Sequence, residues 1–277
     1  MPELPEVETV RRGLNTVVGR RIVSATVGRD RVVRRTSAQT LIDGVTGVEI
    51  TAVQRRGKYL VIHTTGDQRV MIHLRMSGQV LITAADSAPP AHTHVRMMLD
   101  DRREIRFVDP RTFGEVVAYR VRDEPEVVPE LIRLGPDPLV DGIATKYVVA
   151  AFAGRRRRLK DALLDQSVIA GIGNIYGDEI CHAARISPLR PVGSVNRRGV
   201  VRLTDAIHRV LADAVAAGGS TLGDAQYVGV DGAAGTFQNH HRVYGRTGLR
   251  CRTCGRGLIR RTVVSQRSTH HCPVCQR

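Results

Sequence analysis

The chain has 277 residues, a formal net charge of +15 and a pI near 10.7, so its length allows two domains and its charge favours a polyanionic partner, above all nucleic acid. It contains no apolar run of about 18 residues and no signal-peptide pattern, which excludes a membrane-spanning or secreted protein and predicts a cytoplasmic one.

The N-terminus, with the sequence MPELPEVE, offers chemistry that an interior segment cannot. Removal of the initiator methionine, which is usual before a small residue, leaves Pro2 as a free secondary amine. An α-amino group titrates near pH ~7.7–8.0, so part of it is nucleophilic at neutral pH, and its attack on a sugar aldehyde carbon gives an iminium ion. The carboxyl of Glu3 is placed to move protons around the sugar, provided that burial raises its pKa. The alternative is a frayed terminus ahead of a helix.

A helix is predicted over residues 5–18, because Pro5 suits a first turn and apolar residues follow at helical spacing. From residue 20 to residue 119 the hydrophobic period changes to two, which predicts antiparallel strands in a sandwich or barrel. Residues 120–140 are rich in proline and acidic residues and indicate a linker.

Helical periodicity returns after the linker, over residues 145–153, 159–167, 174–185 and 196–217. A basic run from Gly154 to Lys160 includes Arg155 and is expected to contact phosphates, although such a run is often only a solvated face. Gly171, Gly173 and Asn174 open the next helix, where free N–H groups suit a phosphate. Residues 218–236 are glycine-rich and predict a long functional loop.

Four cysteines near the end of the chain form two CxxC pairs separated by 17 residues, namely Cys251, Cys254, Cys272 and Cys275. This spacing predicts a closed tetrahedral site for one structural Zn²⁺. The alternative of two disulfides fits a reducing cytoplasm poorly. Residues 263–269 predict a strand and turn of a β-hairpin, His271 is a weak competitor for the metal, and Cys181 is expected in a core.

Several motifs occur in the same order as in the bacterial formamidopyrimidine-DNA glycosylase family, which this chain resembles from Pro2 to Gln276. They are MPELPEVE, RRGKYL, LRMSG, DPRTFG, AGIGNIY and the paired CxxC knuckles. The resemblance implies an α+β fold in three parts: an N-terminal catalytic β-sandwich with an N-terminal helix (1–131), a helix–two-turn–helix DNA-binding domain with the lesion loop (132–245) and a β-hairpin zinc finger (246–277).

The resemblance also implies catalytic and DNA-binding residues. Pro2 is the expected nucleophile, Glu3 the proton carrier, Lys58 a lesion contact that assists elimination, and Arg267 the ligand of the phosphate beside the lesion. The residues expected to contact DNA are Met76, His92, Arg111, Phe113, Arg155, Lys160 and Asn174. By this resemblance, Met76 is expected to fill the gap left by a flipped nucleotide, Arg111 to face the orphaned base and Phe113 to wedge into the stack.

Some of these side chains also have a plainer interpretation. Lys58 alone resembles a solvated surface charge, Met76 and Phe113 resemble core residues, and His92 with His94 resembles ordinary strand residues. Arg75 stands where the family usually has glycine.

The predicted function is that of a bifunctional DNA glycosylase/AP lyase of base excision repair. It excises oxidised purines, 8-oxoguanine and formamidopyrimidines, from damaged double-stranded DNA and cleaves the strand by β,δ-elimination. A monomer associated with the nucleoid is expected. Two rivals are an endonuclease VIII-like enzyme for oxidised pyrimidines and a zinc-finger protein that binds distorted duplex without catalysis.

Overall fold

The computed structural model describes residues 1–223 and 227–277, and its contacts divide the chain into two compact units. Unit 1 comprises Met1–Ile132 and Ala217–Thr236, and unit 2 comprises Arg133–Ala216 and Phe237–Arg277. This division differs from the three predicted domains. Residues 217–236 group with the N-terminal residues rather than with the helices, and the C-terminal hairpin groups with the helices.

Unit 1 begins with helix α1 (Leu4–Leu14), followed by the 3-10 helix η1 (Asn15–Val17). Pro5 lies in the first turn, where its missing N–H costs no hydrogen bond, and Glu3 with Glu6 forms a capping box. The apolar face of α1 is fully buried in the core of the unit. The helix predicted over residues 5–18 is therefore present, with a 3-10 turn at its end.

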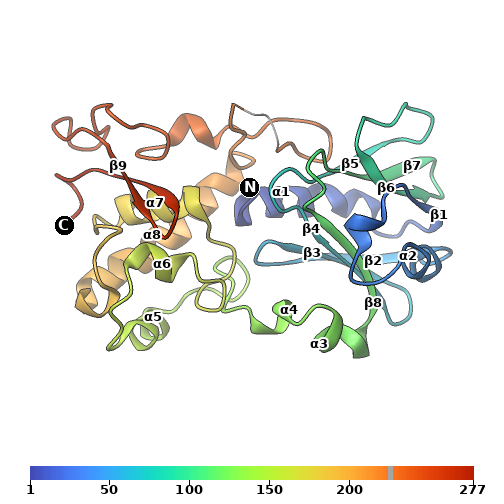
Figure 1. The fold of residues 1–277 in the computed structure, drawn as a ribbon, viewed down its shortest axis with the longest axis horizontal. Coiled ribbons are helices and arrows are strands. Elements are labelled where there is room, and N and C mark those ends of the chain that lie inside the picture. The colour runs from blue at the N-terminus through green and yellow to red at the C-terminus, as the bar shows by residue number, and fades with distance from the viewer. Residues whose placement is uncertain (224–226) are drawn as a thin grey trace. The chain divides into compact units, whose positions relative to one another are not determined.

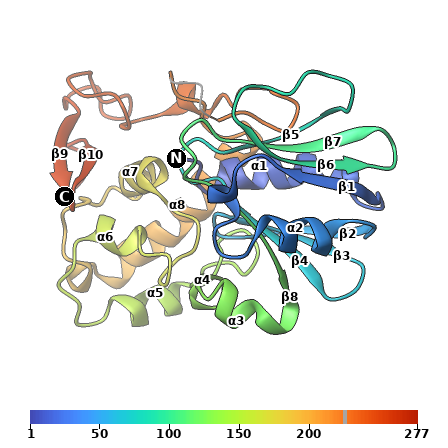
Figure 2. The same cartoon turned by 45° about the vertical axis from the view of Figure 1, so that its right-hand side comes forward.

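Two four-stranded antiparallel sheets contribute most of the remaining core of unit 1. The first has the order β1 (Ile22–Val27), β6 (Thr93–Leu99), β7 (Arg103–Val108), β5 (Gln79–Ala84). The second has the order β2 (Ile50–Arg56), β3 (Tyr59–Thr64), β4 (Gln68–His73), β8 (Glu115–Arg120). Figure 2 shows the two sheets one above the other with α1 beside them, which confirms the predicted sandwich.

Two helical segments interrupt the region that the period-two pattern assigned to strands. They are η2 (Asp30–Val33) and α2 (Ala38–Val45). The hydroxyl of Ser37 caps α2 by accepting a hydrogen bond from the Thr40 N–H at 3.0 Å, and Leu41 and Val45 bury its apolar face. Thr40 and Gly44 within α2 have low helix propensity, which weakens its helical signal in the sequence.

The predicted linker contains three short helices, η3 (Val121–Asp123), α3 (Glu124–Val127) and α4 (Glu130–Arg133). Pro125 in the first turn of α3 and acidic residues near its start favour a helix there.

Unit 2 contains four longer helices, two 3-10 turns and a hairpin. They are α5 (Thr145–Phe152), α6 (Leu159–Leu163), α7 (Asn174–Ala183), η4 (Val192–Ser194), α8 (Arg197–Ala216), η5 (Phe237–His240), β9 (Arg260–Val264) and β10 (Arg267–His271). Figure 1 labels helices α5 to α8 and strand β9. The helices begin within a residue of their predicted starts, and α6 ends four residues early. Among the described helices, none is both long and apolar enough to cross a membrane.

Candidate active site and DNA-binding residues

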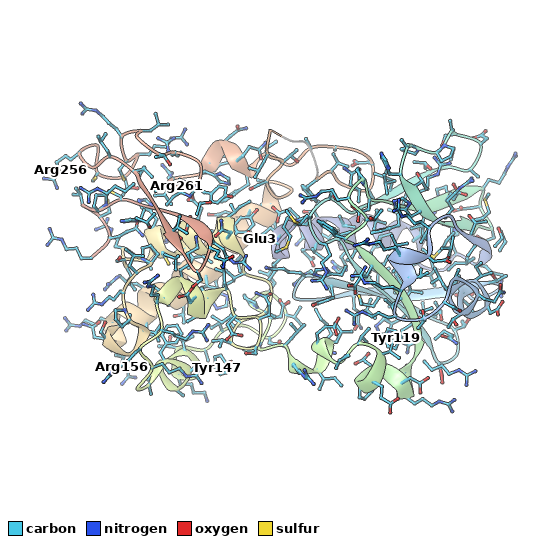
Figure 3. The ribbon with its side chains drawn as sticks, in the orientation of Figure 1. Glu3, Tyr119, Tyr147, Arg156, Arg256 and Arg261 are labelled. Carbon is cyan, nitrogen blue, oxygen red and sulfur yellow. The ribbon has the colours of Figure 1, made fainter. Side chains whose placement is uncertain are left out.

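The start of α1 is packed rather than frayed. Pro2 is buried and the side chain of Glu3 is almost fully enclosed, while Met1 is 46% exposed. The Glu3 N–H donates to the Glu6 carboxylate at 2.8 Å, which fixes the backbone next to Pro2. Figure 3 labels Glu3 at the start of this helix. The predicted nucleophile and proton carrier therefore lie, buried, immediately before the first turn of α1.

Glu6 also fastens a distant segment to α1. Its second carboxylate oxygen accepts a hydrogen bond from the Ser220 N–H at 2.7 Å, across 214 positions of the sequence. Gly219 has φ +78° and approaches so closely that an added Cβ would lie 2.7 Å from the same carboxylate oxygen. The hydroxyl of Tyr227 donates to the carbonyl of Gly218 at 3.0 Å.

The predicted lesion loop is thus held against α1 at both sides of residues 224–226, which lie outside the described residues. Sequence analysis assigned no function to Glu6. The available signal was its position three residues after Glu3, the spacing of a capping box.

Lys58 lies in the two-residue turn between β2 and β3 and is only 7% exposed, so it is not a solvated surface lysine. The buried guanidinium of Arg55 donates to the Gly57 carbonyl at 2.9 Å and to the Glu8 carboxylate at 3.1 Å. This contact ties the Lys58 turn to α1. Burial tends to raise the pKa of Glu8, but hydrogen bonds from Arg11 and Arg12 and the charge of Arg55 outweigh it and lower the pKa.

His73, at the end of β4, is a second residue that sequence reasoning missed. Its ring lies 4.5 Å from the ring of Tyr59, centroid to centroid, and its side chain is buried. Burial, together with the charges of Arg75 and Lys58, lowers the pKa of His73 well below its usual value. The His73 ring is therefore neutral at neutral pH, and the positive charge of Lys58 contributes to this.

Met76 and Phe113 are each 39% exposed, which excludes the interpretation of both as core residues. The guanidinium carbon of Arg111 lies 5.0 Å from the centre of the Phe113 ring, a cation–π distance. His92 is exposed and has φ +64°, whereas His94 is buried. The exposed side chains of this set are available to a ligand, as the predicted DNA contacts require.

Arg75, which precedes Met76, has φ +52°, a conformation that glycine adopts with less strain. Its guanidinium donates to the buried carboxylate of Glu115 at 3.1 Å. Arg34 and Arg35 contact the same carboxylate. The turn can therefore hold an arginine because an ion pair compensates for the backbone conformation.

In unit 2, two turns connect α6 to α7. The Gln166 side chain holds them by donating to the Ile172 carbonyl at 2.9 Å and accepting from the Gly171 N–H at 2.9 Å. Asn174 is the first residue of α7, and its Oδ1 is buried without a hydrogen-bond partner among the described residues. Arg155 and Arg156 are exposed, and Arg156 extends from its ribbon in Figure 3.

Lys160 differs from the expected phosphate ligand. Its side chain is excluded from solvent, and its ammonium donates to the Asp178 carboxylate at 2.7 Å and to the Ser268 carbonyl at 2.9 Å. The same carboxylate accepts from the His270 N–H at 2.7 Å. A buried ammonium needs such partners, so Lys160 connects α6, α7 and β10 instead of facing a ligand.

Glu179, the neighbour of Asp178, holds the segment before the cysteine site. Its carboxylate accepts from the backbone N–H groups of Arg242, Val243 and Tyr244 at 2.8–3.0 Å. Burial raises the pKa of Glu179 in spite of these bonds. Sequence reasoning assigned nothing to the Asp178–Glu179 pair.

The hairpin of β9 and β10 places Arg267 directly after its turn. Ser265 and Gln266 both have positive φ, +45° and +62°, as the two central residues of a type I′ hairpin turn do. Arg267 is exposed at the start of β10, so its guanidinium is open to solvent.

The four predicted cysteines come together with their sulfur atoms within 4.8 Å of one another. The Sγ–Sγ distance is 3.7 Å for Cys251–Cys275 and 3.9 Å for Cys254–Cys272. A disulfide needs about 2.05 Å, whereas sulfurs about 2.3 Å from one tetrahedral ion lie about 3.8 Å apart. The donor set and its spacing therefore fit a metal ion. Cys181 is fully buried, as expected.

His182, on α7, lies beside this cluster with its Nε2 3.5 Å from Cys251 Sγ. A ring N–H at that distance is a hydrogen-bond donor to a thiolate. Sequence analysis named the neighbouring Cys181 but not His182. No pattern in the sequence indicated His182.

Together these features define a nucleic-acid-binding protein of the helix–two-turn–helix class with a four-cysteine metal site. Family models match the formamidopyrimidine-DNA glycosylase N-terminal domain over residues 1–116 and the formamidopyrimidine-DNA glycosylase H2TH domain over residues 134–226. A curated formamidopyrimidine-DNA glycosylase from Herpetosiphon aurantiacus is 44% identical over 278 residues, with 100% of both chains covered.

Two solved structures are also similar. The crystal structure of the MutM (Fpg) protein from Thermus thermophilus has a TM-score of 0.88 and 42% identity, covering 99% of this chain and 98% of that one. Lactococcus lactis Fpg in complex with DNA containing an abasic site has a TM-score of 0.89 and 34% identity, with 99% of each chain covered. The chain belongs to the formamidopyrimidine-DNA glycosylase family.

Proposed function

We propose that this protein is a bifunctional DNA glycosylase/AP lyase that removes oxidised purines, such as 8-oxoguanine and formamidopyrimidines, from duplex DNA in base excision repair. The observation that carries the proposal is the packed start of α1, where Pro2 and Glu3 are enclosed beside the segment that Glu6 holds. Family membership supports the glycosylase activity. A mutant of Lactococcus lactis Fpg has been crystallised with DNA containing Fapy-dG, and Lactococcus lactis Fpg has been crystallised with DNA containing an abasic site.

The nucleophile of the proposed reaction is the Pro2 nitrogen after removal of Met1. Its lone pair attacks C1′ of the damaged nucleoside, the N-glycosyl bond breaks, and the base leaves with the electron pair and a proton. Opening of the sugar ring then gives an iminium ion between Pro2 and C1′. Glu3, one peptide bond from the nucleophile, supplies the proton to the sugar oxygen and receives protons in later steps.

Strand cleavage follows from the acidity that the iminium gives to C2′. Loss of a C2′ proton breaks the C3′–O3′ bond, and a second elimination breaks the C5′–O5′ bond, which leaves phosphates on both sides of a one-nucleotide gap. Lys58 assists these eliminations from its enclosed turn, and Arg267 holds the phosphate beside the lesion.

The proposed DNA contacts are Met76, His92, Arg111 and Phe113 of unit 1 and Arg155 and Asn174 of unit 2. The exposure of Met76 and Phe113 supports their insertion into a stack, and the N-terminal position of Asn174 on α7 supports a phosphate contact. Lys160 is omitted as a direct contact because its ammonium is buried. We infer that it positions the strand of Arg267 through the Ser268 carbonyl.

The proposed metal is one Zn²⁺ held by Cys251, Cys254, Cys272 and Cys275, because four thiolates in a tetrahedron are its preferred structural set. With no open position, the ion takes no part in the chemistry and holds the hairpin that carries Arg267. The three predicted segments, 1–131, 132–245 and 246–277, remain the proposed division of function. A monomer that acts on chromosomal DNA in the cytoplasm completes the proposal.

Borohydride trapping tests the proposal. The purified protein, with removal of Met1 verified by mass, is incubated with borohydride and a duplex that carries 8-oxoguanine opposite cytosine. We expect a covalent adduct that maps to Pro2. The matched control is the same protein with Met1 retained, in which the Pro2 nitrogen is a peptide nitrogen and no adduct is expected.

A second duplex carries an oxidised pyrimidine, because Lactococcus Fpg has also been crystallised with such DNA. An adduct with this duplex alone would move the protein to the endonuclease VIII-like specificity. Tight binding of both duplexes without an adduct would leave a DNA-binding protein and overturn the enzymatic proposal.

A further inference from the structure

Asp109, directly after β7, is a fully buried carboxylate at the base of two exposed turns of unit 1. A carboxylate in such a place needs several hydrogen-bond donors. One of its oxygens accepts from the Ser77 hydroxyl at 2.5 Å and from the Arg111 N–H at 3.2 Å. The other accepts from the Gly114 N–H at 2.7 Å. The single carboxylate therefore joins the turn that carries Met76 to the turn that carries Arg111 and Phe113.

The backbone of Asp109 reaches a third segment. Its N–H donates to the His92 carbonyl at 3.0 Å, and its carbonyl lies 2.9 Å from the Nε2 of buried His94. Of the residues expected to touch DNA in unit 1, four thus lie within three residues of a group that Asp109 contacts. They are Met76, His92, Arg111 and Phe113.

The backbone around Asp109 is constrained at each of these segments. Arg75, His92 and Thr112 all have φ between +52° and +64°, which residues other than glycine rarely adopt. At Gly114 an added Cβ would lie 2.5 Å from the Phe107 ring and 3.1 Å from the Asp109 carboxylate, so glycine is required for the close approach. Such conformations persist where the surrounding contacts determine them, and Asp109 supplies contacts to all three segments.

We propose that Asp109 is the positioning residue that fixes Met76, Arg111 and Phe113 relative to one another, and that it thereby sets how strictly the enzyme reads the base opposite the lesion. This inference rests on the proposed glycosylase function. Asp109 does not touch DNA in this proposal and acts only through the two turns.

The link to base discrimination is geometric. An arginine distinguishes bases by hydrogen bonds whose strength depends on the placement of its guanidinium. Arg111 extends from the backbone N–H that Asp109 holds and lies against Phe113, whose turn ends at the Gly114 N–H that Asp109 also holds. Loss of one carboxylate acceptor frees the two turns to move separately. The hydrogen bonds of Arg111 to the correct and to the incorrect opposite base then differ less in strength.

Asp109→Asn is the primary test, because the amide has the size of the carboxylate but only one acceptor oxygen for the three donors. Single-turnover excision of 8-oxoguanine is measured opposite cytosine and opposite adenine, together with cleavage of a duplex that already contains an abasic site. We expect the cytosine-to-adenine rate ratio to fall about tenfold, which is within the discrimination of one bidentate base contact. Abasic-site cleavage should fall less than excision, because it needs no recognition of a damaged base.

Two further variants keep the test decisive. Ser77→Ala removes one donor of Asp109 and leaves the Arg111 and Gly114 N–H groups in place. It should lower the same ratio severalfold, and it should lower the thermal midpoint as well, because a hydrogen bond to a charged group contributes more to stability than one between neutral groups. Asp86→Asn makes the same chemical change at an exposed aspartate of unit 1 and should leave the ratio unchanged. If Asp109→Asn fails to fold, Ser77→Ala carries the test.

A general loosening of the protein would reduce both rates together and leave their ratio constant. A constant ratio in folded Asp109→Asn and in Ser77→Ala, with an active wild-type protein, would overturn the inference. A wild-type protein that excises no base and forms no borohydride adduct would instead overturn the proposed function.

Discussion

The Lys160 ammonium lies 2.7 Å from the Asp178 carboxylate, and both side chains are almost completely excluded from solvent. The same ammonium donates to the carbonyl of Ser268, the residue after Arg267. A lysine in a strongly basic segment is thus used inside unit 2, where it determines the position of β10. A structural lysine of this kind and a phosphate ligand respond differently to substitution.

Lys160→Ala should destabilise unit 2 by about 3–5 kcal/mol, because it leaves the Asp178 carboxylate buried without its cation. It should weaken DNA binding without changing the slope of log K against log salt. A phosphate ligand would instead lower that slope by about one unit when removed. Urea unfolding and a salt series of binding constants measure the two quantities.

Arg155→Ala is the matched comparison, because Arg155 is an exposed cation of the same basic run. It should reduce the salt slope and leave the unfolding free energy nearly unchanged. Equal slopes for Arg155→Ala and the wild type, with a reduced slope for Lys160→Ala, would restore the sequence-based expectation for Lys160.

Glu6→Gln should impair base excision more than abasic-site cleavage. The carboxylate of Glu6 accepts from the Glu3 N–H and the Ser220 N–H through separate oxygens, and an amide can replace only one of them. An unsatisfied buried N–H costs about 1–3 kcal/mol, which is enough to detach residues around Ser220 from α1. Single-turnover rates on the two substrates and the rate of proteolysis after residue 217 measure the effect.

Glu126→Gln is the control for this change, because Glu126 is exposed on α3 and its neutralisation alters the net charge equally. A Glu6→Gln protein with unaltered proteolysis and equal losses on both substrates would contradict the assigned contact.

Acid should destabilise unit 1 in part through His73. Its pKa is lowered by burial and by the charges of Arg75 and Lys58, so the folded protein favours the neutral ring. The unfolded chain binds the proton with a pKa of about 6.5, so stability is complete above that pH and falls as the pH decreases toward the folded pKa.

The His73→Phe variant keeps a ring against Tyr59 and removes the titration. Its thermal midpoint should fall less than that of the wild type between about pH 7 and pH 5. Other buried histidines contribute to the wild-type slope, so the difference between the two slopes is the quantity to measure. If the thermal midpoints of the two proteins change equally with pH, His73 is not a source of the acid sensitivity.

His182→Phe should loosen the metal site. The ring N–H of His182 lies 3.5 Å from the sulfur of Cys251, and such donors typically contribute about 10–100-fold in metal affinity. We expect faster transfer of zinc to a chelator and a shift of the sulfur-to-metal charge-transfer band of the cobalt-substituted protein to lower energy. His182→Gln, which retains an N–H donor, should recover part of both effects.

The control for this variant is His240→Phe, at an exposed histidine of the same unit. Identical zinc-transfer rates in His182→Phe and His240→Phe would exclude a donor function for His182. Absence of bound metal in the wild type would contradict the metal site itself.

The sequence by itself determined the local features of this protein. The family was indicated by the order of five motifs, namely MPELPEVE, RRGKYL, LRMSG, DPRTFG and the CxxC pairs. Each motif is short and can be recognised from neighbouring residues alone. Period-two hydrophobicity indicated the sandwich, and the cysteine spacing indicated the metal site. The short helix α2 was missed because it contains Thr40 and Gly44, which have low helix propensity, and lies within a region of period-two hydrophobicity.

Only the tertiary structure decided how the charged and polar side chains are used. The sequence suggested a phosphate contact for Lys160 and no function for Glu6 or Asp109. Each becomes important because folding buries it beside donors or acceptors from remote segments. Burial raises the cost of an unpaired charge, so the partners that the fold supplies determine whether a residue faces DNA or holds the protein together. Composition and spacing contain no record of those partners, since Glu6 and Ser220 lie 214 positions apart.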